Sequence, residues 1–172
     1  MDHFLSRATT SDEKERDAKC AILPVGSFEQ HGECLPLITD TVIATVLSRE
    51  LAGAYPLLQL PPVTVSCSHE HSAWRGTVSI SSTTLRAIVD DIYRSITASG
   101  LTSLVVVNCH GGNYSLANVV QEGTLTARRW RCSRPARTGR TPGSQPGSPR
   151  QIMRTCTPAS SRLPSCSTPT PN

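Results

Sequence analysis

Short apolar runs alternate with segments of helical period through the first part of this 172-residue chain, and this alternation constrains the fold most. Residues 20–26 and 104–107 are aliphatic runs, as expected of buried parallel strands. Residues 40–54 and 82–99 carry apolar side chains three and four apart, which is the spacing of an amphipathic helix. The alternation predicts an α/β fold with a layered sheet.

Weaker signals complete the pattern. They predict a strand over residues 57–65, a small strand over 77–80 and a helix over 114–122. Pro61 and Pro62 interrupt the first of these, so that strand is expected to be short or at an edge. Gly100 is expected to end the helix before it, and Thr39 or Asp40 to cap the start of the helix over 40–54.

The composition changes abruptly after Glu122. All 13 acidic residues lie before this point, whereas residues 123–172 contain nine arginines, eight prolines and no acid. Without an apolar period such a segment cannot bury enough surface to offset its chain entropy, so we predict disorder. The predicted organisation is a charged segment over residues 1–19, an α/β domain over 20–127 and an Arg/Pro/Ser/Thr-rich disordered tail over 128–172.

Several classes of protein do not fit this sequence. No run of about 18 apolar residues exists, which argues against a membrane span. The charged N-terminus has no apolar core of a signal peptide, so a cytoplasmic location is expected. Seven cysteines without a CxxC pair argue against a disulfide framework. The basic tail offers only Trp130 for stacking and no RGG repeat, which does not favour nucleic-acid binding.

Polar clusters follow three of the apolar runs, where an open α/β sheet places its ligand crevice. They are GSFEQHG at residues 26–32, SCSHEH at 66–71 and NCHGGN at 108–113. Glu29 and His31 are two residues apart and face the same side of an extended backbone. Asp40 opens the next helix and can return to the same rim, where His110 also lies.

This set of donors indicates a metal site. Mixed imidazole and carboxylate ligands suit zinc, manganese or iron, and one carboxylate can bridge two ions. A lone ExH is common, a lone histidine at a strand end is more often a satisfied surface residue, and HGGN also fits a tight turn. Thiol catalysis is an alternative, but Cys109 and His110 point to opposite faces of an extended chain. Serine-hydrolase and nucleotide-binding motifs are absent from the sequence.

The joint pattern resembles the creatininase (creatinine amidohydrolase) family over about residues 20–123. The matching strings are PVGSFEQHG at 24–32, TDT at 39–41, EH at 70–71, RGTVS at 75–79 and NCHGGN at 108–113. The last string is similar to the HGGN branch, which includes mycofactocin peptidases. The resemblance implies a three-layer α/β/α sandwich with a mostly parallel sheet, incomplete at the C-terminus of this chain. It also implies hydrolysis of a non-peptide amide C–N bond or a small peptide by metal-activated water.

The resemblance also implies the ligands and partners. Four side chains match metal ligands: Glu29, His31, Asp40 and His110. Asp40 is then the bridge between two divalent ions per subunit, which are zinc, manganese or iron. Glu70 and His71 are catalytic candidates near the substrate. The expected partners are a small amide or peptide substrate and further copies of the chain, arranged as a homo-oligomer, often a hexamer.

Two departures from the family pattern matter. Creatininase has a glutamate where this chain has Gly112, which argues against creatinine as substrate. Relatives with HGGN carry a downstream HAGExET motif, which the printed tail lacks. Reading possible codons for residues 129–134 and 154–163 in one shifted frame gives Met-Ala-Leu-Phe-Pro and Asp-Met-His-Ala-Gly-Glu-Leu-Glu-Thr. The hypothesis is a frame-shifted tail. The alternative functions are an inactive, truncated remnant of the enzyme and a peptidase of the mycofactocin-maturation type.

Overall fold

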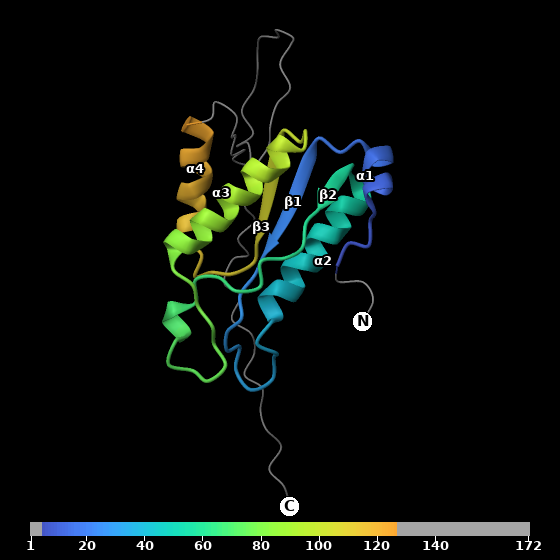
Figure 1. Ribbon diagram of the computed structural model, residues 1–172. Helices are drawn as coiled ribbons and strands as arrows, with labels where there is room; N and C mark the ends of the chain where they lie inside the picture. The colour runs from blue at the N-terminus through green and yellow to red at the C-terminus, as the bar shows by residue number, and fades with distance from the viewer. Residues whose placement is uncertain (1–4, 127–172) are drawn as a thin grey trace, which may run out of the picture.

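The computed structural model describes residues 5–126, and within them it contains a parallel sheet of three strands (Figure 1). The strands are β1 (Cys20–Val25), β2 (Leu57–Gln59) and β3 (Ser103–Asn108), in the order β2-β1-β3. The helices are α1 (Thr10–Arg16), α2 (Thr39–Ala54), the 3₁₀ helix η1 (His69–His71), α3 (Ser82–Ala98) and α4 (Ser115–Thr126). The predicted α/β class with parallel strands is confirmed.

Helices cover both faces of the sheet, so the fold has three layers, with α2 on one side and α3 and α4 on the other (Figure 1). Alternate residues of β1 face opposite layers, because successive side chains of a strand point to opposite faces. Leu23 belongs to the core that Leu85 of α3 and Leu116 of α4 complete. Ile22 belongs to the core that Ala44 of α2 completes. The predicted three-layer sandwich is therefore confirmed in the described part of the chain.

The minor strands are shorter than their apolar runs. β2 ends at Gln59, before the two prolines, and lies at an edge of the described sheet, as predicted. A single parallel bridge between Val25 and Val63 continues its alignment with β1. The strand predicted over residues 77–80 is reduced to one antiparallel bridge between Phe28 and Val78.

The helix ends agree with the sequence in α3 and differ from it in α2. Gly100 follows the C-cap of α3 with a φ of 97°, a left-handed conformation that glycine adopts without strain. The N-cap of α2 is Ile38, without a side-chain hydrogen bond, so the prediction that Thr39 or Asp40 caps this helix is wrong. The Thr39 hydroxyl donates to the Pro36 carbonyl instead, and Asp40 is engaged elsewhere.

One helix appears where the sequence predicted no element. α1 lies within the charged segment, and none of its residues is buried, so it carries no apolar stripe. Its start is fixed by a capping box, in which Thr9 and Asp12 exchange hydrogen bonds. The tail predicted over residues 128–172 lies outside the described residues, and the domain boundaries stay predictions. Within residues 5–126, no helix is long and apolar enough to cross a bilayer.

Candidate metal centre

The candidate site forms where β1 and β3 end, at the same edge of the sheet as the first turn of α2 (Figure 1). Gly26 follows β1 directly, and a Cβ atom there would lie closer than 3.0 Å to the Thr41 backbone. Only glycine permits this approach. The Thr41 hydroxyl donates to the Ser27 carbonyl at 3.1 Å and locks the contact. The neighbouring Asp40 is thereby fixed at the strand ends.

Asp40 is the centre of the cluster. Its Oδ1 lies 3.0 Å from His31 Nε2, and its Oδ2 lies 2.9 Å from His110 Nδ1. The Ser27 hydroxyl donates to Oδ2 at 3.0 Å. Each carboxylate oxygen therefore faces a different histidine, although the histidines come from loops that follow different strands. The role of Asp40 as a bridge between two cations stays a prediction.

Glu29 is a buried carboxylate with a vacant acceptor. Only 5 % of the residue is exposed. Its Oε1 lies 3.2 Å from His110 Nδ1 and 3.9 Å from His71 Nε2. Its Oε2 is buried and has no hydrogen-bond partner among the described residues. Burying such an oxygen without a partner is costly, and a bound cation would satisfy it.

Backbone carbonyls orient both histidines. His31 Nδ1 lies 3.0 Å from the Glu29 carbonyl, and His110 Nε2 lies 2.7 Å from the Cys67 carbonyl. A carbonyl oxygen can only accept, so these two ring nitrogens carry hydrogen. The other nitrogen of each ring faces Asp40. Histidine ligands of metals are commonly held in this way, with one nitrogen donating to a backbone carbonyl.

The electrostatics of the cluster favour charged groups. Burial raises the pKa of Asp40, but hydrogen bonds from His110, His31 and Ser27 outweigh it and lower the pKa below its usual value. Burial lowers the pKa of His110, but its bonds to Asp40 and the Cys67 carbonyl, with the charge of Glu29, raise it overall. In the absence of a cation, these contacts favour the protonated form of His110. Metal binding would displace that proton.

A buried amide network ties the loop after β3 to residues 66–71. The Cys67 N–H donates to Asn113 Oδ1 at 3.1 Å, and Asn113 Nδ2 donates to Asn108 Oδ1 at 2.9 Å. Asn108 Nδ2 donates to the His110 carbonyl at 2.9 Å. These asparagines hold the backbone around His110 in place and, within the described residues, make no hydrogen bond to the side chains of the candidate metal ligands. The sequence reasoning assigned them no role, because their partner at Cys67 is distant along the chain.

The two catalytic candidates lie on η1 at the rim of the cluster. Glu70 Oε1 is 3.9 Å from His110 Nε2. His71 receives a hydrogen bond at Nδ1 from Gln30 Nε2 at 2.9 Å, and its other nitrogen faces Glu29. The structure thus brings all six predicted residues together, whereas their roles stay predictions. Two sets of donors have ligand atoms that all lie within 4.8 Å of one another inside the set, and Glu29 belongs to both: Glu29, His31 and Asp40; and Glu29, Glu70 and His110.

An open hollow of about 520 Å³ adjoins the second set. Glu70, Gly112 and Tyr114 line it. Cys67 also reaches this hollow, but burial and the charge of Glu70 raise the pKa of its thiol. A raised pKa disfavours the reactive thiolate, so thiol catalysis is not supported at Cys67.

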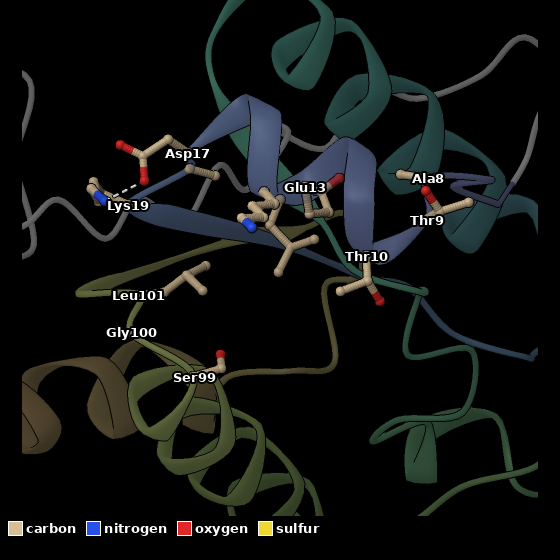
Figure 2. Close-up of a pocket in the computed structure, with 12 residues that line it drawn as sticks. Ala8, Thr9, Thr10, Glu13, Asp17, Lys19, Ser99, Gly100 and Leu101 are labelled. Carbon is tan, nitrogen blue, oxygen red and sulfur yellow. Dashed lines mark hydrogen bonds and ion pairs between the residues drawn. The ribbon is translucent and has the colours of Figure 1, made fainter.

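A different hollow lies at the opposite end of the sheet, before the starts of β1 and β3 (Figure 2). Figure 2 shows Thr10, Glu13 and Leu101 around it, with the ion pair of Asp17 and Lys19 at its side. Its volume is about 700 Å³, and no histidine lines it within the described residues. The donor set therefore places the candidate site at the carboxyl ends of the strands.

Comparison with known proteins agrees with the fold and with the family that the sequence resembles. The family model of creatininase, described as creatinine amidohydrolase, matches residues 6–154. The chain therefore belongs to the creatininase family. The match is longer than the predicted resemblance over 20–123, since it includes α1 and continues past the composition break after Glu122.

Curated relatives agree with this membership. A mycofactocin precursor peptide peptidase of Mycobacterium ulcerans is 42% identical over 101 residues, which cover 54% of this chain and 40% of the relative. A creatinine amidohydrolase of Pseudomonas putida is 28% identical over 127 residues, which cover 67% of this chain and 48% of the relative. The chain thus spans less than half the length of either relative.

Solved structures share the fold. A manganese form of creatininase has a TM-score of 0.61 at 27% identity, covering 75% of this chain and 52% of its own. A zinc–zinc form of a mutant creatininase has a TM-score of 0.63 at 25% identity, covering 74% of this chain and 53% of its own.

Proposed function

We propose that this chain carries the metal centre of an amidohydrolase that cleaves an amide C–N bond, with a peptide as the favoured substrate class. The observation that carries the proposal is the buried, unpartnered Glu29 Oε2 beside two oriented histidines. The likeness to mycofactocin peptidases favours a peptide, and Gly112 in place of the glutamate of creatininase argues against creatinine. A non-peptide amide is the alternative substrate.

The donor set fits divalent cations. Glu29, His31, Asp40 and His110 would hold them, and Asp40 would bridge two ions per subunit. Zinc and manganese suit these oxygen and nitrogen ligands and occur in the creatininase structures above, and iron suits them equally. When bound, the cations would polarise the amide carbonyl and lower the pKa of water. The carbonyls of Glu29 and Cys67 would keep both rings aimed at Asp40, and Glu70 and His71 would face the substrate from the rim.

We also propose that the printed tail impairs the enzyme. Residues 123–172 lack the HAGExET motif, and possible codons for residues 154–163, read in one shifted frame, encode it. Sequencing the coding DNA tests this directly, because one intact frame with other codons would remove the hypothesis. The family match through residue 154 favours that competing outcome for part of the tail. If the shift is real, the printed chain is the inactive remnant that forms the alternative function.

Metal content and turnover test the function itself. The 172-residue chain and a frame-restored chain would be assayed by elemental analysis and by hydrolysis of a short peptide. We expect two metal ions per subunit and hydrolysis in the frame-restored chain, with weaker binding and little turnover in the printed one. A frame-restored chain without bound metal would refute the amidohydrolase proposal. A printed chain that binds two ions and turns over would refute only the impairment.

Location and assembly complete the proposal. We expect a cytoplasmic enzyme that assembles as a homo-oligomer, with a hexamer as the predicted state. Light scattering on the frame-restored chain measures its mass in solution, and a monomer would contradict the prediction.

A further inference from the structure

The carboxylate of Glu70, at the rim of the cluster, lies within reach of the donors Glu29 and His110. Glu70 comes from η1, and its side chain is 45% exposed, so a cation from solvent can reach it. Its carboxylate, one oxygen of Glu29 and one ring nitrogen of His110 lie within 4.8 Å of one another. Two carboxylates and one imidazole make three protein ligands, a number that leaves coordination positions open at catalytic zinc sites.

Gly112 is the residue that makes room for this carboxylate. A Cβ atom on Gly112 would lie closer than 3.0 Å to Glu70 Oε1, the Cys67 carbonyl and His110 Nε2. Any side chain at this position would therefore displace Glu70 or the histidine. The neighbouring Gly111 has no such constraint, because a Cβ atom there would meet nothing within 4 Å.

The buried oxygen of Glu29 is the independent sign of a ligand. Its Oε2 has no hydrogen-bond partner among the described residues, although only 5 % of Glu29 is exposed. Glu29 is also the residue common to both sets of donors. Beside the proposed Asp40 bridge, Glu29 would therefore help to hold a cation with His31 and Asp40 and a second cation with Glu70 and His110.

We propose that Glu70 is a ligand of a second divalent cation, which it binds together with Glu29 and His110, and that Gly112 admits it. This inference rests on the proposed function. It changes the role predicted for Glu70 from a substrate contact to a metal ligand. The hollow lined by Glu70 and Gly112 would then give the substrate direct access to the open positions of that cation.

The test is a titration of the 172-residue chain with Mn²⁺ alone. The electron paramagnetic resonance signal of free Mn²⁺ measures how much remains unbound. Glu70→Gln removes the charge of the ligand, and Gly112→Ala displaces its carboxylate. Glu50→Gln on the exposed face of α2 and Gly111→Ala are the matched controls. Circular dichroism on every variant checks that it folds.

We expect two equivalents in the unsubstituted chain and in both controls. Glu70→Gln and Gly112→Ala should keep the first equivalent and weaken the second by about tenfold or more. Two equivalents of unchanged affinity in Glu70→Gln would overturn the role of Glu70 alone. A single equivalent in the unsubstituted chain that Glu70→Gln leaves unchanged would overturn the second site. No Mn²⁺ binding in the unsubstituted chain would overturn this inference, and the same result in the frame-restored chain would refute the proposed metal centre as well.

Discussion

The two ends of the parallel sheet each carry a pair of acidic and basic side chains, but one pair is exposed and the other is largely buried. At the amino ends of the strands, Asp17 and Lys19 form an ion pair whose side chains are 75% and 66% exposed. At the carboxyl ends, Asp40 and His110 form a pair whose side chains are 14% and 3% exposed. Water solvates the first pair and weakens it, whereas the second pair must satisfy its charges within the protein.

The difference shows where this fold concentrates its chemistry. The chain enters β1 from α1. The residues that follow β1 lie beside the loops that follow β2 and β3 and beside the start of α2 (Figure 1). At the carboxyl end, Asp40 is hydrogen-bonded to His31 and His110, and the unpartnered oxygen of Glu29 is one that a cation would satisfy. We therefore expect substitutions at the carboxyl end to change ligand binding and stability, and those at the amino end to change at most stability.

The largest expected effect is on metal affinity. Asp40→Asn should weaken binding of Mn²⁺ or Zn²⁺ by about a hundredfold, because it removes the charge that both histidines face. Isothermal titration calorimetry measures this change. Asp17→Asn is the matched substitution at the amino end and should leave the affinity unchanged. Equal affinity in the two variants would mean that Asp40 is no ligand.

The next effect combines stability and binding. Gly26→Ala should lower the free energy of unfolding by about 1–3 kcal/mol, because its new methyl group overlaps the Thr41 backbone. Urea denaturation measures the stability, and calorimetry should show weaker metal binding as Asp40 moves. Gly100→Ala, at a φ of 97°, should cost about 1–2 kcal/mol through backbone strain and leave binding intact. A parallel loss of binding in Gly100→Ala would abolish the contrast between the ends.

A buried amide should matter similarly for stability and less for binding. Asn113→Ala leaves the Cys67 N–H without its acceptor, which costs about 1–3 kcal/mol. The Cys67 carbonyl then orients His110 less well, so metal affinity should fall modestly. At the amino end, Thr9→Ala removes the cap of α1 and should cost about 1 kcal/mol without touching affinity. Unfolding curves recorded with and without Zn²⁺ separate these outcomes.

The smallest effect belongs to the exposed ion pair. Lys19→Ala should change the free energy of unfolding by no more than about 0.5 kcal/mol, because the pair is largely solvated. Thermal denaturation at low and high salt checks this expectation. A loss as large as that of Asn113→Ala would show that the amino end is as tightly coupled as the site.

Local patterns predicted the main elements and failed where contacts are distant. β1 and β3 were predicted because buried strands need aliphatic runs, and α3 because its apolar residues recur on one face. α1 was missed because it has no buried residue, although its Thr9 and Asp12 form a capping box that the sequence displays. The predicted cap of α2 was wrong because the Asp40 side chain bonds to His31 and His110 instead. No local sequence rule indicates these contacts.

The site shows the same division. Glu29, His31, Asp40 and His110 were predicted to converge because parallel strands end at one edge, and the structure brings them together. The support from Asn108, Asn113 and the Cys67 carbonyl was not predicted, because it joins loops far apart in the sequence. The contact between Glu70 and Gly112 could not be predicted either, because the sequence does not show which side chain occupies the space beside a glycine.

The sequence by itself determined the kind of elements, their order and the oxygen and nitrogen donors offered at the strand ends. These features are local, because hydrophobic period and side-chain chemistry act over a few neighbouring residues. Only the tertiary structure decided which oxygen of Asp40 faces which histidine, which oxygen of Glu29 stays vacant, and that Glu70 fills the space above Gly112. Those outcomes depend on how three separate loops pack against one another, where each contact is set by atoms that are remote along the chain.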